Sequence, residues 1–177
     1  MLIDLLREDL ERQRYFNGRQ GKGSKIGLLA GVFSPRFAPV LLCRIANSLY
    51  RHKLGALGRL VSFVNFAIFG IEIAVRCEIG PGLYFPHTVG TVIGANRIGR
   101  NAVIYHGVTL GAKEVDMGYD PARRPVIGDD VLIGSGAKVL GGIAIGSHVK
   151  IGANAVVLQS VPDHVVVGGI PAVIIGD

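Results

Sequence analysis

Apolar residues recur every six positions through most of the chain, and this spacing is the strongest pattern in the sequence. The series has one extra residue between its third and fourth members and a longer interruption between its seventh and eighth. Its members are Ile73, Ile79, Phe85, Val92, Ile98, Ile104, Leu110, Ile127, Ile133, Val139, Ile145, Ile151 and Val157. The residues four positions after the members are also small or apolar, with Val89 among them. Apart from the position that falls in the longer interruption, only Asn96 departs from this rule.

A six-residue period matches neither the 3.6-residue turn of an α-helix nor the alternation of a long β-strand. It matches short strands joined by tight corners, in which each apolar residue and the residue two before it point to the interior. Three such strands close a triangular coil of about 18 residues, and the coils stack as parallel strands about 4.8 Å apart. The pattern predicts a mainly β protein in which residues 71–177 form a hexapeptide-repeat parallel β-helix.

Residues 1–70 lack this period and form a separate N-terminal helical segment in our prediction. Residues 1–16 have the pattern of an amphipathic helix, residues 17–27 form a Gly-rich basic linker, and residues 37–53 and 60–71 are again helical in pattern. We expect these helices to pack on the first coil and to cover its open edge.

The positive charge of the protein belongs to this helical segment. The net charge is +6, and residues 1–70 hold 11 Lys/Arg against 4 Asp/Glu. No nucleic-acid motif accompanies the charge, so we expect no nucleic-acid partner. A solvated face is one interpretation, and a peripheral contact with an anionic membrane is the other. The chain has 2 cysteines, its N-terminus has no signal-peptide pattern, and its longest apolar stretch is too short to span a bilayer. We therefore predict a cytoplasmic protein.

The two breaks in the period indicate where function lies, because local failures of a global pattern mark functional or strained sites. One is the extra residue after Phe85, and the other is the polar excursion at residues 112–126. His87 and His106 occupy the same phase one coil apart, so both should lie at one corner on neighbouring coils. Glu72 precedes Ile73 on the first coil and is a candidate to orient the imidazole of His87. The other histidines, His52, His148 and His164, show no such relation in the sequence.

At these residues the sequence resembles the serine acetyltransferase family of left-handed β-helix acyltransferases, and in particular its short, polysaccharide-associated branch. The matching stretches are FGIEI, IGPGLYFPHTVGTVIG, YHGVTLGA, PVIGDDVLIGSGAKVLGGIAIGSHVKIGANAVVL and VPDHVVVGGIPAVIIG, which together cover about residues 60–177.

The resemblance implies a left-handed β-helix, a homotrimer with active sites between subunits, and acetyl-CoA as the donor. It implies direct attack of an acceptor hydroxyl on the thioester, with no metal and no acyl-enzyme. His87 matches the general base and Glu72 its acidic partner. The residues that match the wall of the CoA groove are Gly111, Ala112, Ser135, Lys150 and Ala153. A histidine with a pKa near 6.5 suits the role of base at neutral pH.

The departures from the family concern the acceptor, for which we assign contacts to His106, Arg123 and Arg124. Serine-specific members carry an aspartate where this chain has Pro86, and a histidine where it has Arg124. Two arginines favour an anionic group on the acceptor, so the leading hypothesis is O-acetylation of a sugar of a surface-polysaccharide precursor. The alternative is serine O-acetylation in cysteine biosynthesis, and the arginines could also serve only to order their loop against Asp116 or Asp120. Two further classes are a zinc hydratase, which would need a third histidine ligand, and a trimeric scaffold without catalysis.

Overall fold

The computed structural model describes residues 2–18, 27, 31–116 and 118–177, and its elements follow the two-part pattern of the sequence. The helices are α1 (Leu2–Phe16), α3 (Ala38–Arg51), α4 (Gly55–Phe69) and the short 3-10 helix η1 (Pro121–Arg123). The strands are β1 (Ile71–Ile73), β2 (Glu78–Ile79), β3 (Thr91–Ile93), β4 (Arg97–Ile98), β5 (Val103–Ile104), β6 (Thr109–Gly111), β7 (Val126–Ile127), β8 (Leu132–Ile133), β9 (Lys138–Leu140), β10 (Ala144–Ile145), β11 (Lys150–Ile151), β12 (Val156–Val157), β13 (Val166–Gly169) and β14 (Ala172–Gly176).

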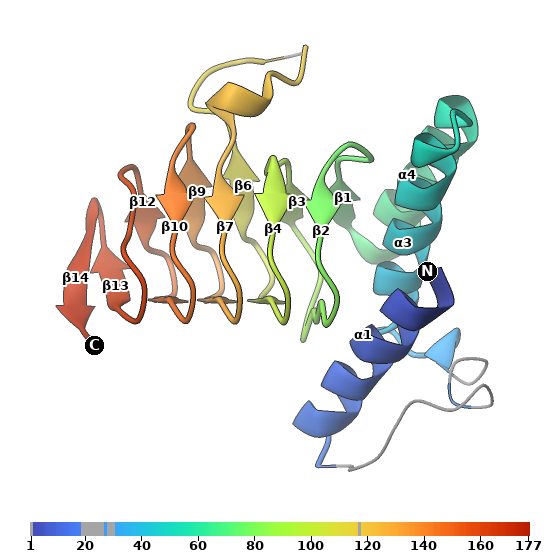
Figure 1. Cartoon of the computed structure of the whole chain (residues 1–177), viewed down its shortest axis with the longest axis horizontal. Coiled ribbons are helices and arrows are strands. Elements are labelled where there is room, and N and C mark those ends of the chain that lie inside the picture. Colours follow the sequence, from blue (N-terminus) through green and yellow to red (C-terminus); the bar gives the residue numbers. More distant parts are fainter. Residues whose placement is uncertain (1, 19–26, 28–30, 117) are drawn as a thin grey trace.

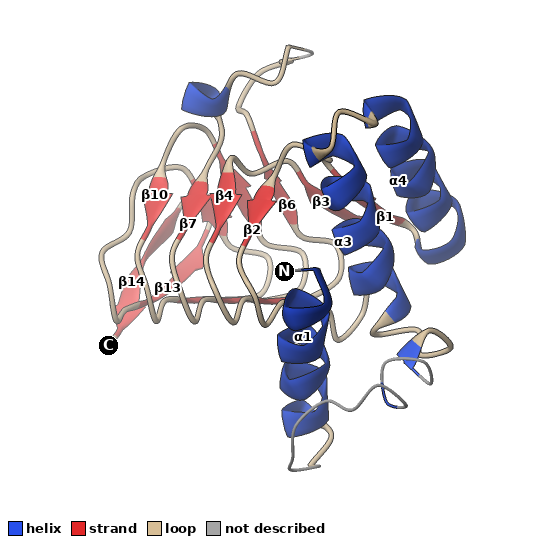
Figure 2. Cartoon of the chain, turned by 45° about the vertical axis from the view of Figure 1, so that its right-hand side comes forward, coloured by secondary structure: helices blue, strands red, loops and turns tan. Residues whose placement is uncertain are grey.

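The strands stack into three parallel sheets that form the walls of a β-helix, as the hexapeptide period predicts. The sheet orders are β1-β3-β6-β9-β12, β2-β4-β7-β10 and β5-β8-β11-β13-β14, and only the β13–β14 pair is antiparallel. Figure 1 shows the coils following one another along the long axis, with the helices at one end and the C-terminal hairpin at the other. Figure 2 shows the same end-to-end arrangement from a second direction.

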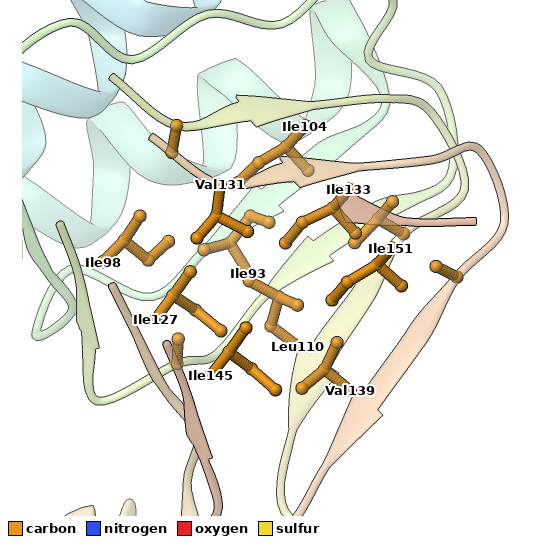
Figure 3. Close-up of a cluster of buried hydrophobic side chains, with 14 of the residues drawn as sticks. Ile93, Ile98, Ile104, Leu110, Ile127, Val131, Ile133, Val139, Ile145 and Ile151 are labelled. Atoms are coloured by element: carbon orange, nitrogen blue, oxygen red, sulfur yellow. The ribbon is translucent and has the colours of Figure 1, made fainter. Parts of the chain in front are cut away.

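The interior of the coil is filled by three ladders of aliphatic side chains, one from each wall. Strand register places Ile98, Ile127 and Ile145 above one another, and the ladders of the other two walls are Ile104–Ile133–Ile151 and Ile93–Leu110–Val139. These side chains meet in the centre of the coil (Figure 3), and all are at most 2% exposed. A single coil buries little, so the core exists only because coils stack in register.

The glycines that follow the ladder residues are required by this stacking at one corner. A Cβ on Gly80 would lie 2.7 Å from the carbonyl carbon of Gly99, and a Cβ on Gly128 would lie 2.7 Å from that of Gly146. Successive coils therefore touch backbone to backbone at this corner, which explains why the repeat has no side chain there.

The register beside the first break differs from the one predicted. Val92 is exposed and Val89 is 73% exposed, whereas Thr91 and Ile93 point into the core. The next corner is shorter by one residue, so that Ala95, and not Asn96, takes the interior position. The prediction of Val89 and Val92 as core residues was wrong, because a strand shifted by one residue exchanges its two faces.

The N-terminal helices cover the open end of the first coil. Helix α3 contributes Val40 and Cys43 to the core cluster of the β-helix, and α4 ends at Phe69, two residues before Ile71 opens β1. Asn47 donates hydrogen bonds to the carbonyls of Val75 and Cys77, which therefore have partners inside the protein. This cover is the role that the sequence predicts for the helical segment.

A buried ion pair connects two of these helices to the first coil. Asp9 on α1 accepts two hydrogen bonds from the Arg44 guanidinium on α3, at 2.8 and 2.9 Å. Arg44 also donates to the carbonyls of Ile79 and Gly80, and the amide of Leu83 donates to Asp9. Asp9 is 1% exposed and Arg44 is 4% exposed, so neither has water as an alternative partner. The position of α1 on the β-helix therefore depends on these two side chains.

We expect Asp9→Ala to lower the free energy of unfolding by about 3–5 kcal/mol, because it leaves the Arg44 charge buried without a counterion. Urea unfolding followed by circular dichroism measures the loss. The double variant Asp9→Leu/Arg44→Met removes both charges and should be more stable than the single variant. A double variant that is less stable than Asp9→Ala would contradict this account.

Candidate functional site

His87 and His106 lie together at one corner of the β-helix, as their shared phase predicts. Each lies in the turn before a strand, His87 before β3 and His106 before β6, and β3 and β6 pair in parallel. Their ring centroids are 5.6 Å apart, with the rings nearly perpendicular at 85°. Both side chains are exposed, so either imidazole is open to a substrate.

This corner continues along the β-helix as a column of stacked turns. The amide of Gly107 donates to the carbonyl of Val89, the amide of Gly136 to that of His106, and the amide of Asn154 to that of Ser135. The residues with positive φ in these turns are Gly90, Gly107, Gly136 and Asn154. The turn of each coil therefore stacks on the turn of the coil before it. The turns that carry the two histidines are followed in this column by the turn that carries Ser135.

Lys138 holds the histidine turn from the next coil. It is half-buried on β9, and its ammonium donates to the Gly107 carbonyl at 2.5 Å. Gly107 follows His106 and has a φ of +68°. This contact fixes the turn that carries the second histidine.

Glu72 lies on β1 with its side chain exposed, next to Val92 in the parallel register. Within the described residues its carboxylate makes no hydrogen bond to His87. Catalytic hydrogen bonds often tighten only when substrate is bound. The role of Glu72 as the orienting group stays a prediction.

Three of the five residues predicted for the CoA groove line one shallow cavity. Ser135, Lys150 and Ala153 enclose it with Tyr105, and its volume is about 350 Å³. Its other lining residues are glycine and aliphatic, so a thin apolar chain can lie close to the wall.

Gly111 and Ala112 lie elsewhere in the fold. Gly111 ends β6, which pairs with β9, while Ser135 lies in the turn before β9. Gly111 and Ser135 are therefore at opposite ends of the strands of one sheet, and Lys150 lies on β11 of another sheet. Nothing lies within 4 Å of a Cβ placed on Gly111, so its surface is open. A single protomer does not bring all five predicted groove residues together.

A second cavity lies beside His87 and is built partly by the N-terminal segment. It has a volume of about 360 Å³ and is lined by Gln13 and Asn17 near the end of α1, by residues 34–36, and by residues 86–89. Gln13 is 8% exposed and donates through Nε2 to the Ser34 hydroxyl at 2.9 Å. Its Oε1 has no hydrogen-bond donor among the described residues. Gln13 thus lines the same cavity as His87 and has a buried amide oxygen without a donor in the described part of the chain.

The sequence reasoning missed Gln13 and the residue that faces the same cavity from the loop, Arg36. The signal available was in the amphipathic pattern of α1, whose buried residues are Leu6, Asp9, Leu10 and Gln13. Two polar residues on an apolar stripe require partners, since burial of an unpaired polar group is costly. Asp9 pairs with Arg44, whereas Gln13 has a partner for its amide nitrogen and none among the described residues for its amide oxygen.

Arg124 is used to order the 112–126 loop. Its guanidinium contacts the Asp116 carboxylate at 2.8 Å, donates to the carbonyl of Gly94 at 3.0 Å, and lies 3.8 Å from the centre of the Tyr119 ring. Burial alone would raise the pKa of Asp116, but hydrogen bonds from Arg124 and from the Asp120 amide outweigh it and lower the pKa. The Asp116 carboxylate is therefore ionised at neutral pH and keeps Arg124 in place.

Arg123 is exposed and contacts the Glu114 carboxylate at 2.6 Å. Both arginines thus have partners inside the loop, which is the arrangement that the loop-ordering alternative expects. An acceptor contact by Arg123 or Arg124 stays a prediction.

His148 and His164 do have a structural relation, contrary to the sequence interpretation. Their rings stack with centroids 4.6 Å apart and an interplanar angle of 14°. Val161 bridges to Ile145, and Val167 pairs with Ile151, so the last coil is shorter than three six-residue repeats. A strict period misses the pair for that reason.

The described residues of this site offer neither a cluster of metal ligands nor a reactive thiol. In the part of the chain that the structure describes, no three His, Cys, Asp or Glu side chains gather as metal ligands, and the zinc alternative needs a third beside His87 and His106. Burial raises the pKa of the Cys43 thiol to about 11 and raises that of Cys77 further. Both thiols are buried and protonated, so neither is a nucleophile.

Comparison with known proteins identifies relatives of this fold and site. A family model described as bacterial transferase hexapeptide (six repeats) matches residues 124–159. The chain is 50% identical over 132 residues to a serine acetyltransferase of Staphylococcus xylosus, which covers 74% of this chain and 60% of the relative. It is 48% identical over 132 residues to a serine acetyltransferase of Staphylococcus aureus strain Mu50, covering 74% of this chain and 61% of that protein. The chain thus spans about three-fifths of the length of these curated relatives.

Solved structures agree over nearly the whole chain. The serine acetyltransferase of Brucella abortus strain S19 superposes with a TM-score of 0.84 at 33% identity, covering 98% of this chain and 68% of that one. A serine acetyltransferase in complex with CoA superposes with a TM-score of 0.83 at 29% identity, covering 98% of this chain and 69% of that one.

We expect Arg124→Ala to release the 112–126 loop, because the variant loses the ion pair, two carbonyl contacts and the Tyr119 stack. Thermolysin should then cleave the loop about tenfold faster before the exposed residue Val115. Arg123→Ala is the matched control, since its partner Glu114 is exposed, and it should change the rate little. Equal cleavage of both variants would show that Arg124 does not order the loop.

Proposed function

This chain belongs to the serine acetyltransferase family of hexapeptide-repeat transferases, and we propose that it transfers the acetyl group of acetyl-CoA to a hydroxyl group, with L-serine as acceptor. His87 is the general base of this reaction. The observation that carries the proposal is the continuous corner column, which joins the His87–His106 pair to the Ser135–Ala153 groove through three backbone hydrogen bonds. This arrangement supports a donor in the groove with its reactive end toward the imidazoles.

The chemistry is a direct transfer. His87 takes the proton from the acceptor hydroxyl as its oxygen bonds to the thioester carbonyl carbon. The carbon–sulfur bond then breaks, and the CoA thiolate leaves and takes that proton from the imidazolium. A positioned base contributes about 10²–10⁴-fold to such a step. The buried state of both cysteines supports a reaction without an acyl-thiol intermediate.

The donor site in this proposal spans two subunits of a homotrimer. Ser135, Lys150 and Ala153 of one chain face Gly111 and Ala112 of another across the groove, which accounts for their separation within a single protomer. Lys150 is exposed, which supports a contact between its ammonium group and a phosphate of CoA.

The cavity beside His87 is the acceptor site. Arg36 pairs with the carboxylate of serine, and the Gln13 amide turns toward the cavity so that its Oε1 accepts from the serine ammonium, which leaves the hydroxyl for His87. Arg36 and Gln13 both line the cavity with His87, and Gln13 Oε1 is buried without a donor among the described residues. High identity to serine acetyltransferases over 132 residues supports serine as the acceptor.

A sugar hydroxyl is the second candidate acceptor, and one observation favours it. The described residues that line the cavity include no carboxylate to neutralise an ammonium group. The sequence argument for a sugar acceptor likewise depends on Pro86 in place of an aspartate, and on Arg124 in place of a histidine. None of the relatives described above supports that branch, so serine remains the first acceptor to test.

We expect His87→Ala to reduce CoA thiol release by about 10²–10⁴-fold, because the base is lost. His106→Ala should reduce the rate of thiol release less than His87→Ala does. His164→Ala, at the stacked pair on another corner, is the control and should retain wild-type rates. Wild-type turnover by His87→Ala would disprove the general-base role.

We expect L-serine to be turned over faster than a panel of nucleotide sugars in the same thiol-release assay. Arg36→Gln should raise KM for serine about tenfold and leave KM for acetyl-CoA unchanged, since the charged contact is to the acceptor alone. Arg97→Gln, an exposed arginine outside the cavity, serves as the control. Turnover of a sugar with none of serine would select the second candidate, and no thiol release with any acceptor would refute the transferase proposal.

A further inference from the structure

The outer surface of α4 is almost entirely apolar. Nine residues of this helix are exposed, and eight of them are apolar: Ala56, Leu57, Leu60, Phe63, Val64, Phe66, Ala67 and Ile68. Phe63 is 64% exposed, Ile68 65% and Leu60 57%. The remaining one is Arg59. Exposed apolar patches of this extent mark interaction surfaces, because leaving them in water costs free energy.

The inward side of α4 is already occupied. Gly58 packs against α3, where a Cβ would lie 2.8 Å from the Ala46 carbonyl oxygen. Asn65 donates to the Pro39 carbonyl, and Ser62 donates to the Ile73 carbonyl. The exposed apolar residues therefore contribute nothing to the fold of a single chain and are available to a partner.

The segment of the sequence that contains this helix is positively charged. Residues 12–71 contain ten Lys/Arg and no Asp or Glu. Arg51 at the end of α3, Lys53 in the turn that follows and Arg59 on α4 are exposed and form no ion pair within the described residues. Phe and Leu side chains beside unpaired cations form the surface that binds at the interface of an anionic bilayer.

The position of α4 leaves this surface free to meet a flat partner. Figures 1 and 2 both place the helix at the end of the molecule opposite the C-terminal hairpin. None of the described helices is long and apolar enough to cross a membrane, so any contact is with the bilayer surface.

We propose that the exposed face of α4, together with Arg51, Lys53 and Arg59, is a docking surface for an anionic lipid membrane. The aromatic and leucine side chains enter the boundary between headgroups and acyl chains, and the three cations contact lipid phosphates. A second copy of the chain is the other occupant to test. A two-fold contact would place these cations against the same cations of the partner, and α4 offers no acidic side chain to pair with them. The contacts of the proposed homotrimer are heterologous, and the light-scattering measurement below tests whether α4 takes part in them.

The full-length protein can be tested by flotation with vesicles of phosphatidylcholine that contain phosphatidylglycerol, and with vesicles of phosphatidylcholine alone. The chain has no tryptophan, so Phe63→Trp introduces a single reporter on the docking surface. Its emission should shift to the blue on anionic vesicles and be quenched by brominated lipids. Salt should weaken the binding, since the cations are exposed.

Two variants separate the apolar and the charged contributions. Phe63→Ser/Phe66→Ser should abolish flotation, and Arg51→Gln/Lys53→Gln/Arg59→Gln should weaken it by about fivefold for each cation removed. The matched control is Val173→Ser/Ile175→Ser, which replaces two equally exposed apolar residues on the hairpin at the far end. It should float like the wild type. Circular dichroism confirms that each variant is folded.

The proposal is overturned if the wild type stays unbound with anionic vesicles at low salt, or if the hairpin control loses flotation as fully as the α4 variant. It is also overturned if Phe63→Ser/Phe66→Ser lowers the oligomeric mass in light scattering while the wild type binds no vesicles, because α4 then covers another copy. None of these results depends on acetyl transfer, so the test is independent of the proposed reaction.

Discussion

Every coil of this protein must place its corners on those of the coil before it, because parallel strands exchange backbone hydrogen bonds only in register. The three interior ladders follow from this constraint, and so do the glycines at the corner where backbones touch. The same constraint positions the candidate site. His87 and His106 come within 5.6 Å of each other because β3 and β6 pair. Ser135 and Ala153 continue that column because the later turns stack in the same way.

The helical segment closes the β-helix and also contributes to the site. Asp9 and Arg44 bind α1 to α3 and to the carbonyls of the first coil. One turn further along α1, Gln13 reaches the cavity beside His87. The ion pair that fixes α1 on the β-helix thus also determines the position of the Gln13 amide, which we propose binds the acceptor. The outer side of α4 in the same segment packs against no other part of the described chain and is exposed to solvent. This exposed side is the surface that we propose contacts the membrane.

The 112–126 loop illustrates how a residue's chemistry depends on its neighbours. From the sequence, Arg124 is expected to present a free guanidinium near the histidine pair and so to bind an anionic acceptor. In the structure its donors reach Asp116 and Gly94, and Tyr119 covers its face. Guanidinium groups that are already paired have little capacity left for a ligand. The cation beside His87 is instead Arg36, from a part of the chain with no repeat pattern.

The sequence by itself determined the β-helix, the helical cover and the shared corner of His87 and His106. These features depend on a six-residue period, which is a local pattern that recurs in each coil and so specifies the same strand and corner geometry each time. The tertiary structure alone decided which face of the strand after Phe85 turns inward, where Ile93 replaced Val92, and it also decided the stacking of His148 on His164. It alone brought Gln13 to His87, across more than seventy positions of sequence. Corner lengths and contacts between distant segments are set by packing of the whole chain, and no local pattern encodes them.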